Sequence, residues 1–114
     1  ELALALGLRL EEGRILGVLA KWEAREGRDT SARERLERGR KLLDGPAARR
    51  GLVELLCLWA RIEADAGRLD EAWETLVEAE GHLSRLPQQP KILLDAVGAL
   101  RERLVAPGAS SAIG

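Results

Sequence analysis

The chain has 114 residues, which suits one small domain. Hydrophobic residues make up 46% and charged residues 32%, so the chain can bury a core, and a net charge of -1 excludes a global attraction to nucleic acid or an anionic membrane. The only aromatic residues are three tryptophans, and Phe, Tyr and Met are absent, so a core must consist mostly of Leu, Ala, Val and Ile. Because Leu and Ala are strong helix formers, this composition predicts helices rather than strands.

Cysteine content and hydropathy indicate the compartment in which the protein is found. A single cysteine excludes an internal disulfide and fits a reducing compartment, so we expect an intracellular protein, cytoplasmic or, in a eukaryote, nuclear. No apolar run approaches the ~20 residues of a membrane helix, and we expect no membrane partner. The chain begins with Glu1 rather than Met, so we expect it to be part of a longer protein.

The first predicted helix includes the opening segment 1–10. Its alternating leucines fit a strand, but the residue types favour a helix and no partner strand exists elsewhere in the chain. An isolated strand is not stable, so we predict a helix that continues to Glu26. A helix that is apolar on several sides is typical of burial between neighbours, and we expect another element to pack on it.

A second helix is predicted over residues 31–43, after a left-handed stop at Gly27. Asp29, Thr30 and Ser31 offer N-cap oxygens, and Ser31 followed by Glu34 has the pattern of a capping box.

Three further helices follow. Asp44-Gly45-Pro46 breaks the chain, and Pro46 suits the first turn of a new helix. The pattern then predicts a helix over 47–66 that ends at Gly67, a helix over 71–86 capped by Asp70, a loop over 87–90, and a helix from Lys91 to Val105. The last residues, 107–114, have linker composition and are predicted to be a flexible tail.

The chain is similar to itself at a shift of forty residues. The matched pairs fall at helix-interface positions: Leu16 and Leu56, Leu19 and Trp59, Ala20 and Ala60, Glu23 and Glu63, Ala24 and Ala64, Gly27 and Gly67, Arg28 and Arg68, Ala32 and Ala72, and Leu36 and Leu76. Self-similarity at a fixed period is typical of stacked helical hairpins. The sequence therefore predicts an all-α fold, in which antiparallel hairpins stack as a short α-solenoid of about five helices.

The second unit resembles a tetratricopeptide repeat. The pattern is Leu56-x2-Trp59-Ala60-x6-Gly67-x4-Ala72-x3-Leu76-x2-Ala79. This resemblance implies one repeat domain over residues 1–106, with a first repeat at about 6–44, a second at about 46–86 and a partial third or capping helix at 91–105. The period of forty is longer than the usual thirty-four of that family.

The first unit is similar to the half-a-tetratricopeptide (HAT) variety. It has Glu23 four residues before Gly27, and then Ala32-Arg33-x2-Leu36-Glu37-Arg38-Gly39. The second unit departs from that pattern, because Trp73 stands where the family has Arg. HAT resemblance implies membership of an RNA-processing assembly, and tetratricopeptide-like arrays also occur as regulatory segments of bacterial transcription activators.

The first functional hypothesis is a protein-interaction scaffold. Stacked hairpins expose a concave surface lined by their first helices, which suits recognition of a peptide or helix. Helical phase places five candidate partner-binding residues on that surface: Arg14, Lys21, Arg25, Glu54 and Arg61. Because at least three repeats are usually needed for stability, we expect the chain to dimerise or to pack against adjacent repeats.

The second hypothesis is contact with RNA. The second helix is basic and the fourth is acidic, so Arg35, Arg38, Glu71 and Glu74 form a candidate electrostatic face for a partner. The other reading is a solvated helix face. RNA contact requires stacking aromatics beside the cations, and the only nearby candidate, Trp22, is expected to pack in the core.

Catalytic and metal chemistry find little support in the sequence. Cys57 lies in an apolar run, His82 is the only histidine, and no acid, base and nucleophile set is visible. We therefore predict no enzyme activity, no cofactor and no metal site. Glu23 and Glu63 lie near the hairpin interfaces, and each is expected to pair with an Arg or with backbone of its own repeat, Glu23 with Arg33 or Arg38.

Overall fold

The computed structural model describes the backbone of residues 1–113 and the side chains of residues 1–105. Within those residues it contains no strand. Its helices are α1 (Leu2–Arg25), α2 (Asp29–Leu42), α3 (Arg49–Asp65), α4 (Leu69–Leu83) and α5 (Lys91–Ile113), with a short 3-10 helix, η1 (Pro46–Ala48), before α3. The predicted all-α fold with five helices is confirmed.

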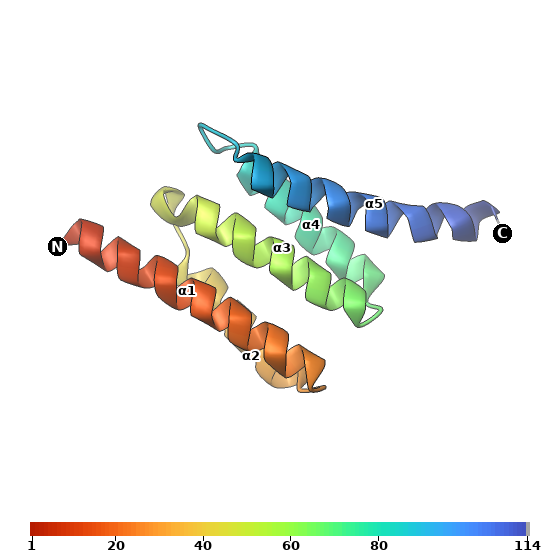
Figure 1. Ribbon diagram of the computed structural model, residues 1–114, viewed down its shortest axis with the longest axis horizontal. Helices are drawn as coiled ribbons and strands as arrows, with labels where there is room; N and C mark the ends of the chain where they lie inside the picture. The colour runs from red at the N-terminus through yellow and green to blue at the C-terminus, as the bar shows by residue number, and fades with distance from the viewer. Residues whose placement is uncertain (114) are drawn as a thin grey trace.

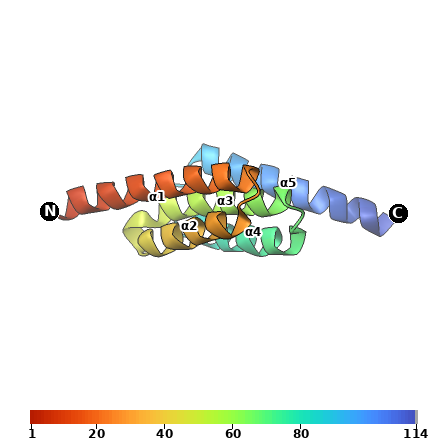
Figure 2. The same ribbon diagram turned by 90° about the horizontal axis from the view of Figure 1, so that it is seen from below.

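The helices form two layers. α1 and α2 make one antiparallel hairpin, α3 and α4 make a second, and α5 follows beside α4 (Figure 1). α1, α3 and α5 lie on one side of the molecule, and α2 and α4 lie on the other (Figure 2). The molecule measures 57 × 34 × 17 Å, and its short axis corresponds to two layers of helices that pack about 8–10 Å apart. This is the arrangement of a short all-α solenoid.

The two hairpins turn in the same way at corresponding positions. Gly27 and Gly67 both have φ of 81°, which glycine adopts without the strain that a Cβ would cause. After each glycine the next backbone N–H reaches back to the first helix, from Arg28 to the Glu23 carbonyl at 2.8 Å and from Arg68 to the Glu63 carbonyl at 2.9 Å. Together with the glycine N–H bonds, these contacts satisfy carbonyls that a helix end would otherwise leave open.

The predicted N-caps are wrong. α2 begins at Asp29 and has Arg28 at its N-cap, so neither Ser31 nor the other expected side chains cap it, and no Ser31–Glu34 capping box forms. α4 likewise has Arg68 at its N-cap, and Asp70 lies in its first turn. The tight glycine turn explains this difference, because the residue that closes the turn also starts the next helix and leaves no room for a separate cap.

Two helix ends differ from the prediction. α4 ends at Leu83 rather than Leu86, because the Arg85 and Leu86 N–H groups bond the carbonyls of His82 and Leu83, three residues back. α5 continues past the expected end at Val105 to Ile113, through most of the predicted tail 107–114. An established helix extends at lower cost than a new one starts, so α5 can continue into a weakly helical sequence. The flexibility of this segment stays a prediction, and Gly114 lies outside the described residues.

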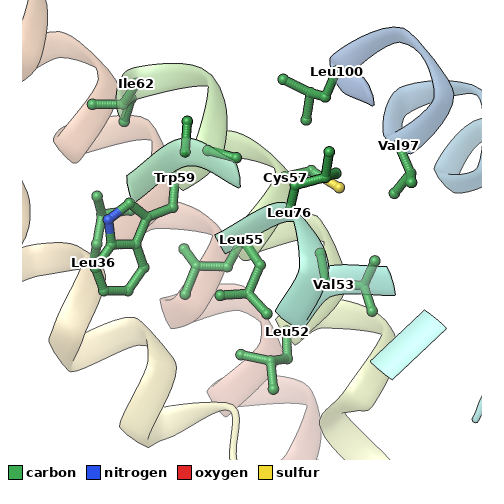
Figure 3. Close-up of a cluster of buried hydrophobic side chains, with 14 of the residues drawn as sticks. Leu36, Leu52, Val53, Leu55, Cys57, Trp59, Ile62, Leu76, Val97 and Leu100 are labelled. Atoms are coloured by element: carbon green, nitrogen blue, oxygen red, sulfur yellow. The ribbon is translucent and has the colours of Figure 1, made fainter. Parts of the chain in front are cut away.

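The core surrounds α3, whose side chains contact every other helix. Leu55, Trp59 and Ile62 point toward the first hairpin, while Val53 and Cys57 point toward α4 and α5 (Figure 3). Trp22 does not join this core, contrary to the sequence prediction, because its side chain is on the side of α1 that no other helix covers. Burial of each large apolar side chain in such a core stabilises the fold by about 1.5–3 kcal/mol.

Substituting the turn glycine tests the hairpin geometry. We expect Gly67→Ala to lower the free energy of unfolding by about 1–2 kcal/mol, because a Cβ at this positive φ is strained. Gly81 is the matched control, since it lies within α4 and a Cβ added there would meet no neighbouring helix or side chain within 4 Å. Gly81→Ala should raise stability by up to about 1 kcal/mol. Urea unfolding followed by circular dichroism measures both changes, and equal effects would contradict the assigned turn.

Candidate functional site

Two clefts lie along the contact line between α1 and α3, two helices that lie side by side in Figure 1. We call this line the α1–α3 seam. The first cleft has a volume of about 370 Å³ and the second about 340 Å³. Leu58 of α3 lines both clefts, so they are neighbours along one seam.

Glycines open the first cleft. Gly13 and Gly17 of α1 and Gly51 of α3 line it, and their missing side chains leave a largely apolar floor that includes Leu10 and Leu58. A Cβ at Gly17 would lie 3.1 Å from Leu58, and a Cβ at Gly51 would lie 3.1 Å from Leu10. The glycines therefore let the two helices pack closely and still leave an open hollow above them.

The second cleft is lined mainly by charged side chains. Lys21 and Arg25 of α1 lie on one side, and Arg61 of α3 lies on the other. Asp29 and Asp65 are the acidic members of its wall. The ring of Trp22 lies 5.9 Å from the Arg25 guanidinium, a cation–π contact that orients this arginine.

The structure brings all five sequence-predicted partner-binding residues to this seam. Arg14 and Glu54 line the first cleft, and Lys21, Arg25 and Arg61 line the second. Helical phase alone located them, because α1 and α3 present corresponding faces to the same side. Whether they bind a partner stays a prediction.

Sequence reasoning missed Arg50 and Leu58, which also line the seam. In the sequence, Arg50 is part of a basic run and Leu58 is one more apolar residue of the third helix. The spacing of Gly13 and Gly17, one helical turn apart, is a signal that a second helix approaches α1 closely at this point.

The seam carries an excess of positive charge that is not neutralised locally. The acids of its walls already have partners: Glu54 lies 3.7 Å from Arg50, Asp65 lies 2.5 Å from Arg103, and Asp29 lies 3.9 Å from Arg68. By contrast, no described acidic side chain lies within ion-pair distance of Lys21 or Arg61. The seam therefore favours an acidic ligand.

The predicted electrostatic face of Arg35, Arg38, Glu71 and Glu74 does not exist as one surface. Arg35 turns to the buried Glu23, and Arg38 lies 3.5 Å from Glu12 of α1. Glu71 accepts a hydrogen bond from Arg33 at 3.2 Å, while Glu74 is exposed. The prediction that these four residues act together is not supported by the geometry, because helix phase turns the two arginines toward α1 and Glu71 toward α2.

Ion pairs between α2 and α4 account for the opposite charges of these helices. Arg33 pairs with Glu71, and Arg40 pairs with Glu78. Arg40 also lies 5.7 Å above the ring of Trp59. The opposite charges of α2 and α4 thus join the two hairpins.

The two buried glutamates hold corresponding positions and differ in their partners. Glu23 accepts a hydrogen bond from Arg35 at 2.5 Å, so the expected partners Arg33 and Arg38 are wrong. Arg33 instead pairs with Glu71 of α4, and Arg38 lies near Glu12, further toward the start of α1. Glu63 accepts a hydrogen bond from the Thr75 hydroxyl at 2.6 Å, in place of the expected arginine or backbone. Each contact joins the two helices of one hairpin.

Burial raises the pKa of Glu63 above its ordinary value. The negative charge of Glu71 also raises this pKa, whereas the Thr75 hydrogen bond and the positive charge of Arg68 lower it. The net increase means that the protonated carboxyl is favoured in the folded chain relative to the unfolded chain.

Cys57 and His82 do not form a reactive pair. Burial raises the pKa of the Cys57 thiol to about 11, so the thiol is protonated at neutral pH. The His82 Nε2 atom lies 3.9 Å from Glu78, in the last turn of α4. Among the described side chains, no group of three or more His, Cys, Asp and Glu residues could hold a metal ion.

We found no protein-family model, curated protein or solved structure that matches this chain. None of its described helices combines the length and the apolar character that a membrane crossing requires. The geometry of the seam is therefore the basis for assigning a function.

Glu63→Gln tests the cost of the buried charge. At pH 7 we expect the variant to melt at a higher temperature than the parent, because it removes a buried negative charge and keeps an oxygen that accepts the Thr75 bond. The stability that protonated Glu63 provides is complete below the unfolded-state pKa and is lost as the pH rises through the raised folded-state pKa. The advantage of the variant should accordingly vanish in acid. Glu74→Gln is the exposed control and should change little, and equal shifts for the two variants would contradict a cost that arises from burial.

Cys57 should resist thiol reagents in the folded protein. At pH 8, a pKa near 11 leaves roughly a hundred times less thiolate than a thiol with the ordinary value of 9.0, and the apolar surroundings also block access. Reaction with a disulfide reagent should be slow in buffer and fast in urea. Rapid labelling of the folded chain would contradict the assigned burial.

Proposed function

We propose that this chain is a non-catalytic helical-repeat module that binds a peptide or helix of a partner protein along the α1–α3 seam. The observation that carries the proposal is the pair of adjacent clefts, the first largely apolar and the second lined by Lys21 and Arg61, which have no described acidic side chain within ion-pair distance. The tetratricopeptide-like sequence pattern supports the same type of function, since stacked hairpins bind partners on the surface formed by their first helices.

The ligand should combine acidic and apolar side chains. Gly17, Val18 and Leu58 provide apolar surface that an anchoring side chain would bury. Lys21 and Arg61, in the neighbouring cleft, provide charge for a carboxylate next to that anchor. A segment with an apolar residue followed by acidic residues fits both clefts at once.

The RNA-processing alternative has weaker support. The cations of α2 that made it attractive, Arg33 and Arg40, are paired with glutamates of α4. Phosphate contacts would have to replace these ion pairs, whereas an acidic ligand at Lys21 and Arg61 of the seam would replace none. A regulatory role within a transcription activator is compatible with the same peptide-binding seam and depends on the parent protein.

Charge reversal tests the seam directly. We expect Lys21→Glu combined with Arg61→Glu to weaken binding of acidic peptides selected from a displayed random library by about tenfold or more, or about 1.4 kcal/mol. Arg85→Glu reverses an exposed charge that does not line the seam, and it should leave binding within about twofold of the parent. Affinity measured at several salt concentrations should fall as salt rises.

Three outcomes would contradict the proposal. The first is that the library yields no selected sequence. The second is that the Lys21→Glu and Arg61→Glu pair binds as well as the parent, and the third is that Arg85→Glu weakens binding equally.

A further inference from the structure

A row of large apolar side chains lies on the outer face of α1, away from the seam. Leu8, Ile15, Leu19 and Trp22 follow one another at helical spacing, and their exposed fractions are 63%, 51%, 38% and 59%. Contiguous exposed apolar surface of this kind marks an interaction site. Each of these side chains is more than a third exposed, and α1 and α2 form one end of the stack in Figure 1.

Corresponding positions in the second hairpin are covered. The residues forty positions later are Ala48, Leu55, Trp59 and Ile62, which are 1%, 4%, 7% and 8% exposed. The correspondence is structural, because α1 ends at Arg25 and α3 at Asp65, and both are followed by glycines with the same φ. The packing of the second hairpin therefore shows what kind of element can cover such a row.

The cover on the second hairpin is α2, which brings small residues to the row. A Cβ at Gly39 would lie 3.0 Å from Leu55, so a glycine is needed where α2 crosses this leucine. Ala32 of α2 lines a small hollow together with Trp59 and Ile62. A helix with two small residues seven positions apart thus fits over such a row.

Ion pairs flank this contact. Asp29 of α2 lies 3.9 Å from Arg68, and Arg40 of α2 pairs with Glu78. The first hairpin has Arg28 and Arg38 at the positions that correspond to Arg68 and Glu78. Arg28 lies 3.5 Å from Glu26 and Arg38 lies 3.5 Å from Glu12, but both arginines stay solvent-exposed, with 63% and 72% of their side chains accessible. A helix that covers the α1 row should therefore carry acidic residues at both of these ends.

We propose that the outer face of α1, with Arg28 and Arg38, docks an amphipathic α-helix of a partner. This helix carries small residues at the positions of Ala32 and Gly39 in α2, and acidic residues at the positions of Asp29 and Arg40. The helix packs on α1 as α2 packs on α3, with one charge reversed. A second copy of the same surface fits less well, because it would bring large side chains and the same two arginines without the small residues that allow a close approach.

The test uses a helical peptide whose sequence is residues 28–43 of this chain with Arg40→Glu, stabilised by a lactam bridge on its outer side. The peptide contains no tryptophan, so tryptophan emission from the 114-residue chain reports on the exposed Trp22. We expect a saturable blue shift that disappears in the Trp22→Phe protein. Leu19→Glu should weaken binding at least tenfold, and Ile15→Glu gives a second, independent disruption. Ile92→Glu, on α5, is the matched exposed control and should bind normally.

Charge and size controls identify the binding mode. The peptide with native Arg40 should bind about threefold more weakly, and Arg38→Glu in the protein should reverse that preference. The peptide with Gly39→Leu in addition to Arg40→Glu should lose at least tenfold in affinity. Circular dichroism confirms that each protein variant is folded.

Several results would overturn this assignment. The first is that millimolar peptide causes no saturable shift in tryptophan emission. The second is that the parent and Arg38→Glu proteins each bind the Arg40 and Arg40→Glu peptides equally well. The third is that the parent self-associates and Leu19→Glu abolishes this, which would assign the face to a second copy. Loss of peptide binding in Lys21→Glu with Arg61→Glu, but not in Leu19→Glu, would also overturn it and would leave the seam proposal intact. If Lys21→Glu with Arg61→Glu leaves the binding of acidic peptides unchanged, while Leu19→Glu still weakens binding of the helical peptide, only the seam proposal is rejected.

Discussion

Burial of α3 is the interaction on which the rest of the structure depends. This helix contacts all four others, and its apolar side chains point both toward the first hairpin and toward α4 and α5 (Figure 3). In a chain of 114 residues without Phe, Tyr or Met, few other elements could provide a comparable core. α1 lies against α2 and α3, and α5 lies against α3 and α4, so each is at one end of the stack.

That asymmetry gives α1 two different surfaces. Toward α3 it has glycines and cations, which form the seam, and away from α3 it has the large apolar row of Leu8, Ile15, Leu19 and Trp22. The opposite charges of α2 and α4, which suggested a partner face, instead join the two hairpins through Arg33–Glu71 and Arg40–Glu78. Ion pairs between α2 and α4 hold the two hairpins together, whereas Lys21 and Arg61 have no described acidic partner and line the seam.

The sequence predicted much of the fold because it is encoded locally. Apolar spacing and the glycines at 27 and 67 were enough to locate five helices and both turns, and helical phase placed Arg14, Lys21 and Arg61 on a common side. The N-caps could not be predicted in this way, because Ser31 and Asp70 have good capping chemistry but the turn closes before them. Ion-pair partners were also missed. The choice of Arg35 over Arg33 for Glu23 depends on a rotation of α2 about its axis by a fraction of a turn, which residue types alone do not specify.

The exposure of Trp22 could not be predicted from the sequence for a related reason. Tryptophan at helical spacing is typical of a core, and its counterpart forty residues later, Ile62, is indeed buried. Burial at that position requires a helix on the far side, and the first hairpin has none among the described residues. Position in the stack, rather than residue type, determines which copy of an apolar row is open.

Native-state hydrogen exchange, resolved by residue, tests the central claim that α3 holds the molecule together. The backbone amides of α3 from Val53 to Ile62 should exchange most slowly, through global unfolding only, while those of α1 before Gly13 should exchange through local opening at lower free energy. If α1 is as strongly protected as α3, or if α3 exchanges through local opening, the central role assigned to α3 is wrong.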